Sequence, residues 1–94
     1  MAIVVSADAQ FDEAQAFEFE LERGIARATE FVDALEALYQ RLDSYPESAP
    51  ILEHHIRRVV LQRLGYNVFY RIDGADVVIL RIIHGRMDPS HWPS

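Results

Sequence analysis

The stretch HIRRVVLQRLGYNVFYRIDGADVVILRIIH, residues 55–84, decides the fold class of this chain. Three segments in it, at 55–62, 66–72 and 76–84, are rich in β-branched and aromatic residues, as strands are. The links RLG and DGAD are short enough for hairpins, so the three strands should run antiparallel. The last segment is apolar on both faces, which is typical of a strand inside a sheet.

The residues before this stretch predict one strand and a first helix. The β-branched run AIVVS, at 2–6, favours an opening strand. Ser6 or Asp8 can cap the helix that follows, and Gly24 can end it. The apolar positions that we expect to face the core recur at helical spacing, namely Ala7, Phe11, Ala14, Phe17 and Leu21.

A second helix follows, and its apolar face is the clearest pattern in the sequence. The face has the spacing i, i+3, i+4 and i+7 and consists of Ala28, Phe31, Val32, Leu35, Leu38, Tyr39 and Leu42. The segment SYPESAP, at 44–50, ends the helix because prolines stop it. The order is therefore strand, helix, helix, strand, strand, strand. We expect an α+β fold in which a helix hairpin packs on a mostly antiparallel four-stranded sheet.

Length and composition restrict the class of protein. The 94 residues suit a single domain spanning 1–94. There are no cysteines, which excludes a disulfide framework and a thiolate zinc site. The N-terminus lacks the pattern of a signal peptide, and no run approaches the roughly 20 apolar residues that a transmembrane helix needs. We expect a cytoplasmic protein with no membrane partner and no cofactor.

The charge is unevenly spread along the chain, whose net charge is −6. Residues 1–53 hold twelve acids and three arginines, whereas residues 54–94 hold three acids and six arginines. The first half is therefore a poor surface for nucleic acid, and the second half can meet an acidic partner. We expect no sequence-specific binding of nucleic acid by this chain.

Four pieces of the sequence, taken in order, resemble the RelE/ParE family of bacterial toxins. They are LDSYPESAP, IRR, GYNVFYRID and VVILRIIHGRMDPSHW. The family repeatedly shows a helix that ends at proline, an Arg-bearing strand, a Tyr-rich strand with YR, and an apolar strand that runs into HGR and a terminal Trp. The order of the pieces carries the resemblance, which spans nearly the whole chain.

The resemblance implies the toxin of a type II toxin–antitoxin pair, which a small antitoxin protein wraps and neutralises. Two branches of the family differ in their target. RelE-like members cleave messenger RNA on the ribosome, whereas ParE-like members inhibit DNA gyrase and have no known hydrolytic chemistry. For the ParE-like branch, the implied partner is a ParD-like antitoxin.

Several positions depart from the nuclease branch, in which RNA cleavage needs a base, cations and an acid. The Arg that typically follows Gly-Tyr in the middle strand is Asn67 here, and the terminal aromatic residue, often Tyr, is Trp92. The usual lysines are absent, and Arg57 and Arg58 are too basic to act as general bases. The resemblance therefore favours the ParE-like branch and no catalytic residue. The alternatives are a ribosome-dependent endoribonuclease and an inactive member that only binds antitoxin.

The C-terminal piece HGRMDPSHW, at 84–92, is then interpreted as a contact surface anchored by Trp92. Arg81 lies inside an apolar strand and needs an acidic partner, from the first helices or from the antitoxin. Asp88 and His91 have a conceivable metal-ligand spacing, but two ligands without a third predict no metal site. The residues expected to contact the antitoxin or the target are Arg57, Arg58, Tyr70, Arg71, Arg81, His84, Arg86, His91 and Trp92.

Overall fold

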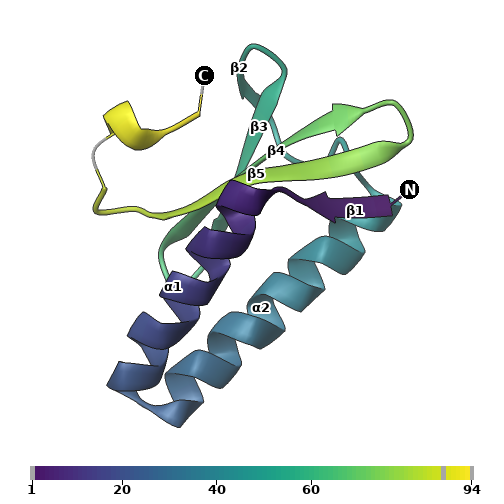
Figure 1. Cartoon of the computed structure of the whole chain (residues 1–94). Coiled ribbons are helices and arrows are strands. Elements are labelled where there is room, and N and C mark those ends of the chain that lie inside the picture. Colours follow the sequence, from purple (N-terminus) through teal and green to yellow (C-terminus); the bar gives the residue numbers. More distant parts are fainter. Residues whose placement is uncertain (1, 88, 94) are drawn as a thin grey trace.

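Two helices, five strands and one short 3₁₀ helix make up residues 2–87 and 89–93, the part of the chain that the computed structural model describes. In chain order the elements are β1 (Ala2–Val5), α1 (Ala7–Arg23), α2 (Ile25–Ser44), β2 (Ile51–Glu53), β3 (Ile56–Leu61), β4 (Tyr66–Asp73), β5 (Asp76–His84) and η1 (Pro89–His91). Both helices lie on one side of the sheet, and η1 lies on the other side (Figure 1).

The sheet is mixed, with its strands in the order β1-β5-β4-β3-β2. The strands β2 to β5 pair antiparallel with their neighbours. In contrast, β1 pairs with β5 in parallel, from Ala2 opposite Asp76 to Val5 opposite Ile79. A parallel pair needs a long connection between its strands, and the helix hairpin begins that connection.

The strand β2 is the element that the sequence analysis did not predict. It has three residues, Ile51–Glu53, which follow Pro50 directly and are all exposed. A run this short shows no period of two, so no strand pattern marks it. The prediction of a four-stranded sheet is therefore wrong, because the sheet has five strands and is mixed. The helix hairpin and the other four strands are confirmed.

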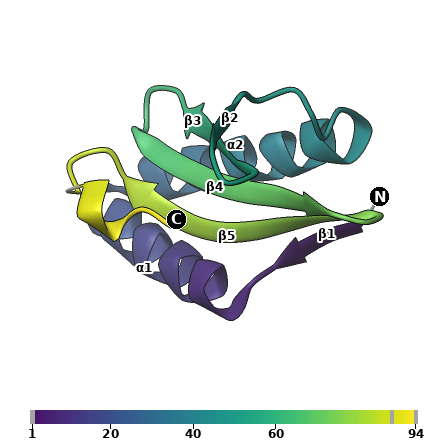
Figure 2. The ribbon, with the colours of Figure 1, turned by 90° about the horizontal axis from the view of Figure 1, so that it is seen from above.

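The main hydrophobic core lies between the helices and the sheet, and Figure 2 shows the sheet extended over both helices. The strand β4 turns Tyr66, Val68 and Tyr70 toward this core, with the alternation that a strand requires. The buried face of α2 is the one that its periodicity predicts, and its fully buried members are Ala28, Phe31, Leu35, Leu38 and Leu42.

The helix α1 meets the interior mainly through small residues. Ala9 and Ala16 are buried, so the helix approaches its neighbours closely. The predicted core face of this helix is wrong, because all five of its residues are exposed, namely Ala7, Phe11, Ala14, Phe17 and Leu21. The helix therefore carries apolar surface that the chain itself does not bury.

A second, smaller hydrophobic cluster covers the face of the sheet that points away from the helices. Ile56, Phe69 and Ile83 are buried there, and Leu80 and Trp92 pack against them. The segment after β5 crosses this face, so that η1 lies over the sheet (Figure 1). We call this surface the outer face. Trp92 anchors the C-terminal segment to it.

The turn between β2 and β3 is strained, because His54 and His55 have φ values of 49° and 67°. Glu53 pairs with Ile56, so these two histidines form a two-residue hairpin turn with positive φ at both positions. Asn-Gly is the preferred sequence for such a turn. We therefore expect the double substitution H54N/H55G to raise the free energy of unfolding by about 1 kcal/mol.

Urea denaturation at neutral pH measures this change. The substitution H91N, at an exposed histidine in η1, is the matched control and should leave the midpoint unchanged. A double variant with an unchanged or lower midpoint would contradict the inferred strain in this turn.

Candidate functional site

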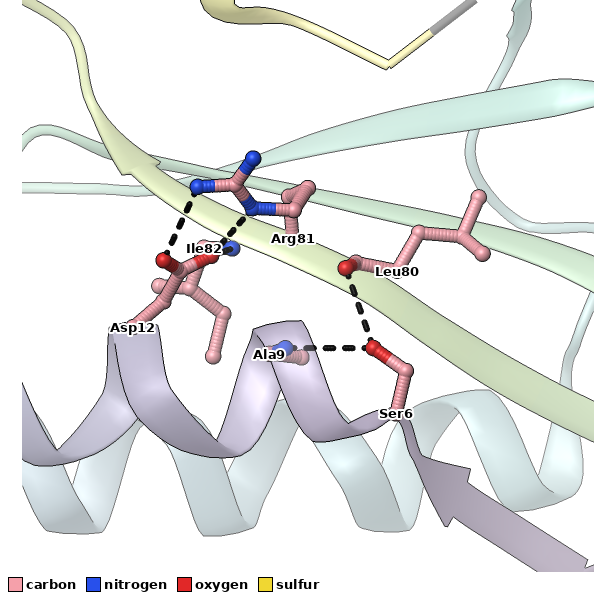
Figure 3. A network of polar contacts seen from close by, with 6 residues as sticks. All are labelled: Ser6, Ala9, Asp12, Leu80, Arg81 and Ile82. Carbon is pink, nitrogen blue, oxygen red and sulfur yellow. Dashed lines mark hydrogen bonds and ion pairs between the residues drawn. The ribbon is translucent and has the colours of Figure 1, made fainter.

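The C-terminal half of β5 has no neighbouring strand on its β1 side, because β1 ends at Val5 opposite Ile79. The first turns of α1 cover this edge instead (Figure 3). The Ser6 hydroxyl donates to the Leu80 carbonyl at 3.1 Å and accepts from the Ala9 amide at 3.1 Å. Of the two residues that the sequence offered as the helix cap, Ser6 and Asp8, it is Ser6 that caps α1. Its hydroxyl also satisfies a backbone carbonyl at the edge of the sheet.

Asp12 closes the same edge further along α1. Its Oδ2 accepts from the Ile82 amide at 2.9 Å and from Nε of Arg81 at 2.7 Å, and its Oδ1 accepts from Nη2 of Arg81 at 3.0 Å (Figure 3). The β4–β5 register shifts between Phe69 and Tyr70, which marks a bulge at this point of β5. The acidic partner expected for Arg81 therefore comes from the first helix, in a bidentate pair.

A groove runs between α1 and the C-terminal half of β5, and we call it the α1–β5 groove. It is a cavity of about 370 Å³. Its apolar walls include Phe11, Phe19 and Met87, whose exposed fractions are 62%, 49% and 44%. Arg23 and Arg86 also line it, and the aspartate on its wall is already engaged in the ion pair described above. The groove therefore offers apolar contact beside positive charge.

A buried carboxylate, that of Glu20, supports the far end of this groove. Glu20 is 0% exposed and accepts from the Tyr66 hydroxyl at 2.8 Å and from Nε of Arg27 at 3.0 Å. Nη1 of Arg23 lies 4.0 Å from the same carboxylate. Burial raises the pKa of Tyr66, and its hydrogen bond to Glu20 raises it further. This network ties the helix hairpin to the start of β4.

His84 makes a structural hydrogen bond at the end of β5, where its Nδ1 accepts from the Arg86 amide at 3.1 Å. Its ring lies edge-on to that of Tyr66, with centroids 5.0 Å apart. Burial lowers the pKa of His84 below its ordinary value, and the charge of Arg86 lowers it further, against a raising effect of Glu20. The imidazole is therefore neutral at pH 7, and the Nδ1 lone pair that a base would use is already occupied.

Protonation of His84 should destabilise the fold. The protonated ring carries hydrogen on Nδ1 and no longer accepts from the Arg86 amide. The pKa of His84 is lower in the folded chain than its unfolded value of about 6.5. The free energy of unfolding should therefore have its full value at a pH above about 6.5, and it should fall as the pH drops through the pKa of the folded chain.

We expect the urea midpoint of the wild type to decrease more between about pH 7.5 and about pH 5 than that of H84Q, which lacks this titrating group. The exposed histidines are common to both proteins, so they cancel in the comparison. Equal decreases in the two proteins would show that His84 does not contribute to the pH dependence.

The outer face is filled by stacked side chains. The Trp92 ring packs on Phe69 with centroids 5.3 Å apart, and the guanidinium carbon of Arg58 lies 5.0 Å from the Trp92 ring centroid. Phe69 is 0% exposed, and Asn67, on the same face of β4, is 7% exposed. Packing against an aromatic ring thus holds this arginine in place.

Arg57 and Tyr70 anchor the loop after α2. Nη1 of Arg57 donates to the Ala49 carbonyl at 2.6 Å, and the Tyr70 hydroxyl donates to the Pro46 carbonyl at 2.7 Å. Both side chains therefore support the fold locally. Arg71 is exposed on β4, with Nη2 3.8 Å from an oxygen of Asp73.

The expected contact residues thus separate into distinct places. Arg81, His84 and Arg86 line the α1–β5 groove, whereas Arg58 and Trp92 lie on the outer face, where His91 is exposed in η1. Arg57 and Tyr70 anchor a loop, and Arg71 stands apart. The contribution of α1 to the groove, which includes Phe11, Phe19 and Arg23, was not predicted from the sequence.

Residues 2–87 and 89–93 hold no group of three side chains that could bind a metal ion. Asp88, which the sequence analysis considered with His91, lies outside the described residues. Within the same ranges, no helix has the length and apolar character needed to cross a membrane.

Comparison with known proteins places this fold in a family. The family described as "ParE toxin of type II toxin-antitoxin system, parDE" matches residues 3–89. A solved chain of the "Chromosomal ParDE TA system from P. aeruginosa" has the same fold, with a TM-score of 0.75 and 19% identity over 89% of this chain and 95% of that chain. No curated protein matches the sequence. Because the family match covers most of its length, this chain belongs to the ParE toxin family of type II toxin–antitoxin systems, as its resemblance predicts.

Proposed function

We propose that this toxin acts in the cytoplasm by binding and inhibiting DNA gyrase, and that a ParD-like antitoxin neutralises it. The gyrase target follows from the resemblance to the ParE-like branch. One observation supports this branch over the nuclease branch, namely the apolar packing of the outer face. This chain departs from the nuclease branch at Asn67 and at Trp92, and both residues lie on that face.

A site that cleaves RNA needs a base with a free lone pair and cations that can reach the phosphate. On the outer face, Phe69 and Asn67 are buried, and Trp92 covers Phe69. Arg58 packs against the Trp92 ring, and His84 uses its Nδ1 in a backbone hydrogen bond. This arrangement supports a toxin that presents a binding surface in place of a reaction site.

The α1–β5 groove supports an antitoxin segment that is both apolar and acidic. Phe11, Phe19 and Met87 are exposed apolar side chains that a partner would bury. Arg23 and Arg86 can pair with carboxylates of that segment, which would add specificity to the apolar contact. The groove is therefore the part of the expected contact set that we assign to the antitoxin.

A charge reversal in the groove tests this assignment. We expect R86E to weaken the affinity for a ParD-like antitoxin by about tenfold or more in titration calorimetry, because it places a carboxylate against the acidic segment. The matched control is R71E, at an exposed arginine of β4 outside the groove, and it should change the affinity little. Equal effects of the two substitutions would contradict the assignment.

Two readouts test the target. Toxin added to purified gyrase should block supercoiling, and messenger RNA should stay intact after a short pulse of toxin expression without antitoxin. Codon-periodic RNA cleavage together with normal supercoiling would contradict the proposal and identify a ribonuclease. An inactive family member would change neither readout, which would also contradict the proposal.

A further inference from the structure

A second groove lies on the opposite flank of α1, between α1 and α2, and we call it the α1–α2 groove. It is a cavity of about 330 Å³. Phe17, Val32 and Leu35 form apolar walls, and Glu13 and Glu36 bring two carboxylates to it. Thus α1 separates a groove with arginines on its walls from a groove with glutamates on its walls.

The α1–α2 groove contains an unsatisfied polar group. Tyr39 lines it, and the hydroxyl oxygen of Tyr39 is buried without a hydrogen-bond partner among the described residues. Buried hydroxyls in proteins are nearly always hydrogen-bonded, so this one can take a donor from a bound partner or from solvent. Burial raises the pKa of Tyr39, and the nearby charge of Glu13 raises it further.

Glu13 is a second polar residue of the α1–α2 groove. It is half-buried beside this hydroxyl, and burial raises its pKa above the ordinary value. No ion pair to Glu13 occurs within residues 2–87 and 89–93, whereas Asp12, its neighbour on the other flank of α1, is fully engaged by Arg81. A half-buried carboxylate without a cation is costly, and a positive partner would remove that cost.

We infer that the α1–α2 groove is a socket for an arginine side chain of the antitoxin, an inference that rests on the proposed function. The polar groups that line it are the carboxylates of Glu13 and Glu36, the hydroxyl of Tyr39 and the amide of Gln10, whose nitrogen donates to the Val5 carbonyl. The oxygen atoms of all four side chains can accept hydrogen bonds. A guanidinium group has five donors in a planar fork and is weakly hydrated, so it fits such a site better than a lysine ammonium does.

The apolar walls of the socket suit the rest of an arginine side chain. The three-carbon stem can lie along Phe17, Val32 and Leu35 while the charged end reaches the carboxylates. An antitoxin segment that crosses α1 would then place acidic residues on the β5 flank and a basic residue on the α2 flank. The two grooves together define a charge pattern that the antitoxin must match.

Nuclear magnetic resonance of the full-length toxin tests the socket itself, with N-acetyl-arginine amide as the probe. N-acetyl-citrulline amide has the same shape without the charge and is the control ligand. We expect saturable shifts of α1 and α2 amides around the socket with the arginine probe only. The affinity of the probe should fall at least severalfold in E13Q and in Y39F, but not in E18Q, at an exposed acid of α1 outside the groove. Equal shifts with both ligands, or full binding to E13Q, would overturn the inference.

The role of the socket in binding the antitoxin is tested in a separate experiment. E13Q should weaken its binding to the toxin by about tenfold, and E18Q should not. An unchanged antitoxin affinity of E13Q would overturn the inference even where the probe binds. The gyrase assay contains no antitoxin, so its result can fail or succeed independently of the socket.

Discussion

Replacing Glu20 with alanine is expected to lower the free energy of unfolding by about 3 kcal/mol or more. Glu20 is fully buried and accepts from Tyr66 and Arg27, so E20A leaves a buried hydroxyl and a guanidinium without their acceptor. It also leaves a cavity where the side chain was. The decrease in the free energy of unfolding should exceed the decrease caused by removing any single hydrogen bond, because the network joins α1, α2 and β4.

Denaturant unfolding of three variants separates these contributions. Y66F removes one hydrogen bond of the network and should cost about 1 kcal/mol. E18A, at an exposed acid two residues from Glu20, should change stability by less than about 0.5 kcal/mol. If E20A were as stable as E18A, the buried network would not hold the hairpin on the sheet.

Replacing Asp12 with alanine is expected to cost about 2–3 kcal/mol of stability, because hydrogen bonds to charged groups are stronger than neutral ones. D12A removes both contacts to Arg81 and also leaves the Ile82 amide without its acceptor at the edge of β5. It should also free Arg81 to turn toward the α1–β5 groove, which would add a cation to the antitoxin site.

Asp8, an exposed acid in the first turn of the same helix, provides the control. D8A should cost only a few tenths of a kcal/mol, from the weaker interaction with the helix dipole. Circular dichroism melts in the two variants measure the difference. Similar melting temperatures of D12A and D8A would show that the pairing with Arg81 contributes little.

The parts of the fold that the sequence predicts well are those with long, regular patterns. The segments 66–72 and 76–84 coincide with β4 and β5 to within a residue, because long runs of β-branched and aromatic residues bounded by turn residues mark strands. The face of α2 from Ala28 to Leu42 is equally clear. In contrast, β2 has three residues, and the parallel pairing of β1 with β5 is a long-range contact that no local pattern specifies.

The candidate site was harder to predict for a related reason. The phenylalanines of α1 recur on several sides of the helix, and an exposed one cannot be told from a buried one by spacing alone. Glu20 stands between Glu18 and Glu22 in a run of alternating acids, so nothing in the sequence marks it as the buried member. The need of Arg81 for an acidic partner was predictable from its apolar strand, but the identity of that partner depends on how α1 crosses β5.

The placement of the antitoxin in the α1–β5 groove is tested most directly by labelling methionine and isoleucine methyl groups of the toxin and adding a ParD-like antitoxin. Met87 lines the groove, whereas Ile51 is 54% exposed on β2 at the far edge of the sheet. We predict that the Met87 methyl signal shifts on binding and that the Ile51 signal stays in place. A shift at Ile51 with an unchanged Met87 signal would contradict this placement of the antitoxin.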